Sequence, residues 1–178
     1  MSEFQNAPEA TVRSTGTRYG VLLGLVSFVY FIVLNMMGMD ATQGWARWAS
    51  LLLSVGLLVL AHLYYRDNGN GYMSFGQGVS ISFWIGLVAG LIAVAGTLAY
   101  IEFVDTGYME RISDLQRQAM EEQGLEEEQI EQALDMSAKF MTPGFFFLFG
   151  LIGNVVMTVL MGLLISIFTQ RPDTRMPE

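Results

Sequence analysis

The sequence predicts an all-α membrane protein with four transmembrane helices and an acidic extramembrane helical hairpin between the third and the fourth. The composition supports this class, because 52% of the 178 residues are hydrophobic, only 15% are charged and the mean hydropathy is +0.42. The apolar residues gather in four runs of about 20 residues or more, which is the length that crosses the roughly 30 Å hydrocarbon core of a bilayer. The net charge of −8, by contrast, lies in one segment.

The four expected spans cover residues 19–37, 45–65, 78–101 and 144–168. Arg47 is the one charged residue inside them, and it lies near a span end. Aromatic rings mark the limits of the second span, as is typical of side chains at the two membrane interfaces: Trp45, Trp48, Tyr64 and Tyr65. The short connections predict antiparallel neighbours, and residues 1–16 and 171–178 are expected to be tails, the first of them disordered.

The acidic segment between the third and fourth spans is predicted to be a helical hairpin over residues 106–141. Eleven acidic residues and three basic ones lie between Glu102 and Met141, so this segment accounts for the whole net charge. Apolar residues recur there at helical spacing on both sides of Gly124: Met109, Ile112, Leu115, Ile130 and Leu134. The narrow apolar face is expected to lie against the membrane surface or the bundle.

This charge bears on the choice of partner. Nucleic acid and anionic lipid headgroups would both be repelled, so neither is expected to bind the segment. The cluster Glu126–Glu131 could hold a divalent cation, but it lacks the Asp-Gly-centred loop of a dedicated calcium site. A solvated helix start, favoured by the helix dipole, is the interpretation we adopt, and no metal site is predicted.

Basic residues near the span ends predict the orientation. With the N-terminus in the cytoplasm, that side receives Arg13, Arg18, Arg66, Arg171 and Arg175. The outer side receives Arg47, Arg111, Arg117 and Lys139, two of which lie far from any span. Both termini are therefore expected to be cytoplasmic.

Small residues at intervals of four predict where helices pack. One such face opens the first span and another runs along the third: Gly16, Gly20, Gly24, Gly78, Ser82, Gly86 and Gly90. In lipid the hydrophobic effect does not drive helix association, so close van der Waals contact between backbones must do so. The first and third spans are expected to make the closest contacts. A conduction path and a homodimer face are the alternatives for the glycine face.

A few polar residues in the spans could carry chemistry or packing. His62 is the one histidine, and with no Cys in the chain and no paired carboxylates nearby it is expected to be an interfacial hydrogen-bonding residue rather than to bind a metal. Asn154 lies ten residues into the fourth span, with Thr158 one turn later, and Asn35 lies near the end of the first. Asn154 is predicted to bond between helices, with a substrate contact as the alternative. No catalytic or cofactor-binding motif is found.

Several stretches of the chain, taken together, resemble domain-of-unknown-function family 4199. They are Tyr64–Gly69, Met73–Gly78, Gln123–Glu131 and Phe140–Gly144, and the resemblance extends from about Thr17 to Gln170. The chain departs from the pattern at Asp105-Thr106-Gly107, where Asp-Pro is expected. The resemblance implies a multi-span protein of the bacterial inner membrane, mainly from Bacteroidota, and implies no activity, cofactor or catalytic residue.

Two functional classes remain after these exclusions. The chain is expected to be a structural or accessory membrane protein that contacts partner proteins, either another envelope protein or further copies of itself. The alternative is a small oligomeric transporter or channel, and against it no Asp, Glu, Lys or Arg lies at the middle of any span. An enzyme is not expected.

Overall fold

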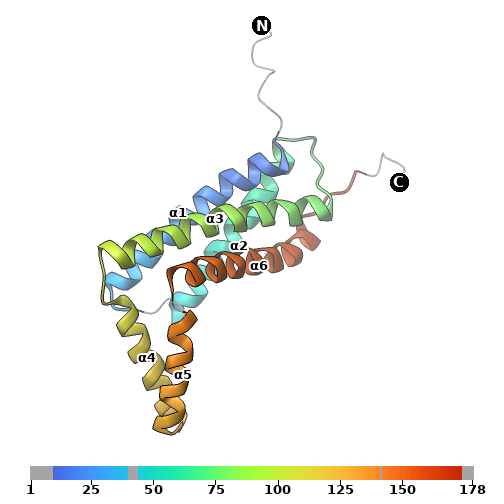
Figure 1. Cartoon of the computed structure of the whole chain (residues 1–178). Helices are drawn as coiled ribbons and strands as arrows, with labels where there is room; N and C mark the ends of the chain where they lie inside the picture. Colours follow the sequence, from blue (N-terminus) through green and yellow to red (C-terminus); the bar gives the residue numbers. More distant parts are fainter. Residues whose placement is uncertain (1–9, 40–43, 141, 174–178) are drawn as a thin grey trace. The chain divides into compact units, whose positions relative to one another are not determined.

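The computed structural model describes residues 10–39, 44–140 and 142–173, and six α-helices lie within these ranges (Figure 1). They are α1 (Val12–Met36), α2 (Gly44–Asp67), α3 (Phe75–Phe103), α4 (Tyr108–Glu122), α5 (Glu127–Phe140) and α6 (Pro143–Thr169). The predicted fold class is confirmed, because α1, α2, α3 and α6 are each long and apolar enough to cross a membrane. The shorter pair, α4 and α5, forms the acidic hairpin between the third and fourth of these helices. The chain is a multi-pass membrane protein.

The first helix begins earlier than the apolar run. Thr11 and Ser14 form a capping box, in which the Thr11 hydroxyl accepts from the Ser14 backbone N–H at 3.1 Å and Ser14 Oγ accepts from the Thr11 N–H at 3.0 Å. Residues 12–16, which were expected to belong to a disordered tail, are therefore helical. The rest of that expected tail, residues 1–9, lies outside the described residues.

The connection between α2 and α3 is a tight turn with defined ends. Gly71 adopts φ +83°, and a second capping box at Ser74 and Gln77 starts α3. Between the two, Met73 exchanges backbone hydrogen bonds of 2.9 and 2.8 Å with Arg171. This bridge joins the start of α3 to the segment that follows α6.

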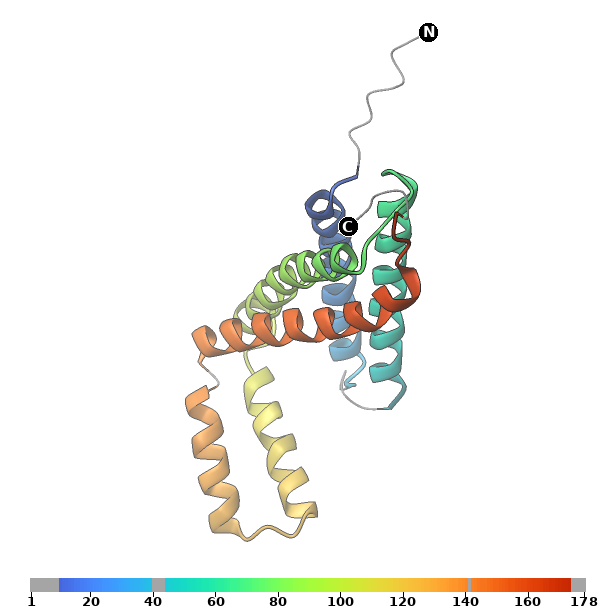
Figure 2. The same ribbon diagram turned by 90° about the vertical axis from the view of Figure 1, so that its right-hand side faces the viewer.

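Two compact units make up the chain, one of residues 1–93 with 152–178 and the other of residues 94–151. In the first unit α1 and α2 lie side by side (Figures 1 and 2). Its core is a cluster of buried apolar side chains from α1, α2, α3 and the turn before α3: Leu23, Leu58, Ala61, Met73, Ile81, Ile85 and Ala89. This unit holds His62 and the polar side chains around it.

The second unit contains the end of α3, the hairpin and the start of α6. The two hairpin helices run side by side, joined at Gly124, which adopts φ +77° (Figure 2). Ser137 Oγ donates to Gln116 Oε1 at 3.3 Å, and Arg117 forms an ion pair with Glu127. Among the described hairpin residues from Tyr108 to Phe140, Ile130 alone is buried. The hairpin thus has almost no core of its own.

Candidate functional site

The glycine face of α1 lies against α3. A Cβ atom placed on Gly20 would lie 2.7 Å from Val88 Cβ, and one on Gly24 would lie 2.9 Å from Ile92 Cβ. A Cβ on Gly16 would collide with Trp84. Because real Cβ atoms do not come so close to other side chains, only glycine allows this backbone approach.

The close contact expected between the first and third spans is present, but the small residues of α3 face α6 and not α1. A Cβ on Gly78 would collide with Ser166, and one on Gly86 would lie 2.9 Å from Thr158 Cβ and 3.1 Å from Val155 Cα. Ser82 is fully buried and occupies the space that a side chain on Gly162 would need. Gly90, the last member of this face, is buried. The helix α3 therefore packs with two different faces, one toward α1 and one toward α6.

Sequence reasoning missed Gly162 and Ser166 in the α6 half of this contact, although a signal was present. Thr158, Gly162 and Ser166 are small residues spaced four apart, and all three are buried. Asn154 continues the series by one turn toward the start of the helix. The same rule that identified the glycines of α1 and α3 would have identified this face.

His62 lies at the centre of a buried polar cluster formed by α2, α3 and α6. Its side chain is fully buried, with Nε2 3.0 Å from the Gly78 carbonyl oxygen and Nδ1 2.8 Å from Thr169 Oγ1. Ser82 Oγ donates to the same Gly78 oxygen at 3.0 Å and lies 3.4 Å from Nε2. One imidazole thus hydrogen-bonds to two other helices, which places the predicted hydrogen-bonding histidine inside the bundle.

The partners of His62 determine its tautomer. A carbonyl oxygen can only accept, so Nε2 carries the hydrogen and Nδ1 of a neutral ring accepts from the Thr169 hydroxyl. That hydroxyl also lies 2.9 Å from the Ile165 carbonyl, and its one hydrogen cannot serve both acceptors. A charged ring would remove this competition, because Nδ1–H could then donate to Thr169 Oγ1 while Thr169 donates to Ile165.

Nucleophilic catalysis does not suit this arrangement. A serine nucleophile needs a base that accepts its proton, but Nε2, the ring atom nearest Ser82, already carries a hydrogen and donates to Gly78. In the part of the chain that the structure describes, no three His, Cys, Asp or Glu side chains gather as a metal site would require. The chemistry that the cluster supports is hydrogen bonding between helices.

Two groups beside the cluster lack a partner within the described residues. Ser166 Oγ is buried against Gly78, and Arg66 Nε is buried while its Nη1 donates to the Thr169 carbonyl at 3.3 Å. The arginine is one turn beyond His62 on α2, so its cation meets the C-terminal end of α6, where the helix dipole is negative. This contact ties the ends of α2 and α6 together.

The two asparagines make different bonds. Asn154 Nδ2 donates across to the Gly86 carbonyl on α3 at 3.1 Å, which is the interhelical bond that the sequence predicted. Asn35 Nδ2 donates to the Phe31 carbonyl of its own helix at 2.9 Å. Thr158 Oγ1 likewise bonds within α6, to the Asn154 carbonyl at 2.7 Å. Only Asn154 therefore adds to the contact between α3 and α6.

The charged side chains of the hairpin form local pairs. Arg111 donates to both carboxylate oxygens of Asp105, with Nη1 2.9 Å from Oδ1, and this hydrogen bonding holds the pKa of Asp105 below its ordinary value. The hydrogen bond from Arg117 to Glu127 raises the pKa of that arginine further. Within the cluster Glu126–Glu131, the Glu126 N–H donates to Gln129 and Glu128 accepts from Gln132 at 3.4 Å. These contacts are those of a solvated helix start.

Comparisons with known proteins identify the family but no activity. The model of the family described as protein of unknown function DUF4199 matches residues 18–171, and the chain therefore belongs to this family. No curated protein and no solved structure matches the chain.

Proposed function

We propose that this member of the DUF4199 family is a structural or accessory protein of the bacterial inner membrane, whose four spans anchor an acidic hairpin for contact with a partner protein. Both termini are cytoplasmic in this proposal, so the hairpin lies on the outer side of the membrane. No enzymatic role is part of it.

The observation that carries the proposal is the exposed apolar surface of the hairpin. Leu115 on α4 is 47% exposed and Met136 on α5 is 62% exposed, while Ile130 is the buried apolar residue between the helices. A hairpin this small gains little stability from a single buried side chain, so apolar residues left at its surface favour a second contact. The surrounding charge of −8 favours a basic or neutral protein surface over an anionic membrane surface.

Retention of a partner tests this proposal. The native protein is cross-linked in cells and then purified in mild detergent. It is compared with a Leu115→Ser, Met136→Ser double variant and with a triple variant in which Glu126, Glu127 and Glu128 are replaced by Gln. We expect a stoichiometric partner that is lost from the double variant and weakened in the triple variant. The control is Leu164→Ser on α6, which is 65% exposed and lies in a span away from the hairpin. Equal retention by all variants would contradict a hairpin-mediated contact.

The orientation has its own test, because the chain contains no native Cys. Single cysteines at Asn70 and at Glu128, both exposed positions, are treated in intact cells with a membrane-impermeant thiol reagent. Labelling is expected at position 128 and not at position 70. The opposite pattern would reverse the proposed topology.

The second candidate is a small oligomeric transporter, and the His62 cluster is the observation that favours it. An ionisable side chain inside a span, surrounded by hydroxyls, is typical of proton pathways. The test is proton flux into liposomes containing the purified protein, compared with a His62→Leu variant. Flux above that of empty liposomes that is lost in the variant would favour the transporter over the accessory protein.

A further inference from the structure

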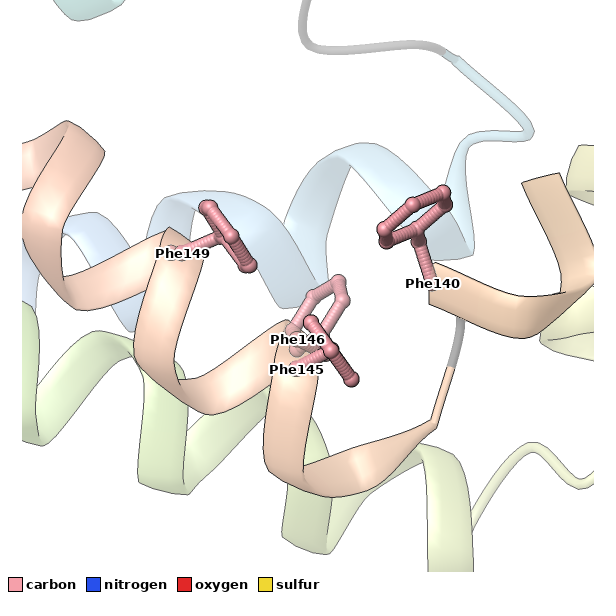
Figure 3. Close-up of a pocket in the computed structure, with 5 residues that line it drawn as sticks. Phe140, Phe145, Phe146 and Phe149 are labelled. Atoms are coloured by element: carbon pink, nitrogen blue, oxygen red, sulfur yellow. The ribbon is translucent and has the colours of Figure 1, made fainter. Parts of the chain in front are cut away.

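An apolar hollow lies where the hairpin meets the fourth span. It has a volume of about 400 Å³ and is lined by Phe140 at the end of α5 and by Phe145, Phe146, Phe149 and Gly150 on α6 (Figure 3). The rings of Phe145 and Phe149 stack, with centroids 5.6 Å apart and an angle of 5° between their planes. Phe140 meets Phe145 edge to face at 5.5 Å. The hollow thus has ordered aromatic walls, and all of its residues belong to the second unit.

The chain order places this hollow at the membrane boundary. The segment before it is the extramembrane hairpin, and the helix that begins at Pro143 is a membrane span. Side chains from the first two turns of α6 therefore lie at the depth where lipid acyl chains start below their headgroups. Phe145 and Phe149 are 41% and 57% exposed, so the hollow is open to its surroundings.

The residue directly before Phe140 in the sequence is basic. Of the three basic residues of the hairpin, Arg111 pairs with Asp105 and Arg117 pairs with Glu127. Lys139, in the last turn of α5 and directly before Phe140, is exposed and has no ion pair within the described residues. A lysine that directly precedes a residue lining an apolar hollow suits a ligand with a phosphate and a hydrocarbon chain.

We propose that this hollow binds one acyl chain of a zwitterionic membrane phospholipid, whose phosphate lies at Lys139. The headgroup follows from charge, since the segment with net charge −8 repels lipids with a net negative charge, whereas a phosphate balanced by its own ammonium can meet Lys139 without that penalty. The bound lipid fixes the end of α5 against the start of α6. This inference does not depend on the proposed function.

Native mass spectrometry of the full chain in detergent tests the site. The protein is equilibrated with phosphatidylethanolamine or phosphatidylglycerol carrying the same two acyl chains, and the lipid retained per protein is measured against concentration. We expect one phosphatidylethanolamine to be retained in preference to phosphatidylglycerol. Lys139→Gln should weaken that retention about fivefold, since an exposed ion pair contributes up to about 1 kcal/mol. Phe149→Ala, which removes one wall of the hollow, should weaken it about tenfold.

Two matched controls separate the site from general effects. Arg117→Gln removes an equal charge from the hairpin at a cation that already has a carboxylate partner. Phe168→Ala removes an equal ring from the opposite end of α6, where Phe168 is 86% exposed. Both should retain lipid as the parent does. Equal retention of the two lipids by the parent, a preference for phosphatidylglycerol, or equal losses in the controls would each overturn the proposal. If Phe149→Ala does not fold, Lys139→Gln with its control still decides the outcome, because Lys139 is exposed and has no ion pair among the described residues.

Discussion

Around His62, polar side chains from α2, α3 and α6 point inward and hydrogen-bond to one another, whereas along α4 and α5 they point outward. The environments explain the difference. In lipid a polar group must find its partner within the protein, and in water it need not. In the first region His62 uses both of its ring nitrogens in hydrogen bonds to other helices. In the second they remain available for contact with another molecule.

Disrupting the contact between α3 and α6 should cause the largest loss of stability. Gly86→Leu should lower the stability by about 3 kcal/mol, because its side chain must displace Thr158 and the backbone at Val155. Thermal unfolding in detergent measures this. The control is Leu87→Ile, a change of equal volume at the next position, which should have little effect. If the two variants unfold at the same temperature, the small-residue face of α3 is not a packing surface.

Replacement of His62 should give the next largest loss of stability. His62→Leu should cost about 1–2 kcal/mol, because the hydrogen bonds from α2 to Gly78 and Thr169 are both lost. His62→Gln, which keeps an N–H donor for the Gly78 carbonyl, should recover part of the loss. Unfolding temperatures of the three proteins in one detergent provide the comparison. A leucine variant as stable as the parent would show that these polar groups do not hold the helices together.

Asn154 and Asn35 allow a hydrogen bond between helices to be compared with one inside a helix, and the expected losses of stability are smaller. Asn154→Leu should cost about 0.6 kcal/mol, the average for a hydrogen bond between membrane helices, because its partner lies on α3. Asn35→Leu breaks a bond within α1 and should cost less. Unfolding temperatures measured side by side test the order, and the reverse order would mean that bonding between helices is not what distinguishes the two residues.

The smallest expected effect is a pH-dependent change in local stability at the start of the hairpin. Since Arg111 lowers the pKa of Asp105 in the folded protein, their pairing stabilises the first turn of α4 above the unfolded pKa of about 4 and is lost as the pH falls through the lower, folded value. Hydrogen exchange of the segment 104–112 should therefore become faster, relative to the intrinsic rate, below about pH 4. Asp105→Asn should show the faster relative exchange at neutral pH, and Asp114→Asn should not. Protection that does not change with pH in the parent would contradict the role of this pair.

The start of α1 was predicted too late, because hydropathy was given more weight than the capping residues. The apolar run begins at Tyr19, yet the helix begins at Val12, because Thr11 and Ser14 satisfy its first backbone N–H groups. Residues 12–16 are polar enough that hydropathy alone assigns them to a tail. A capping box is as local as hydropathy, so this boundary was open to prediction from residue types.

The sequence by itself determined which segments cross the membrane, where the hairpin lies and which residues are small enough for helix contact. These properties follow from the hydropathy and size of neighbouring residues, which the bilayer selects without reference to the rest of the chain. Only the tertiary structure decided that the face from Gly78 to Gly86 meets α6 rather than α1, and that His62 bonds to Thr169, 107 positions away. In lipid every apolar face is equally satisfied, so the choice of neighbour depends on how well the surfaces of all the helices fit together, and that fit is not a property of any one segment.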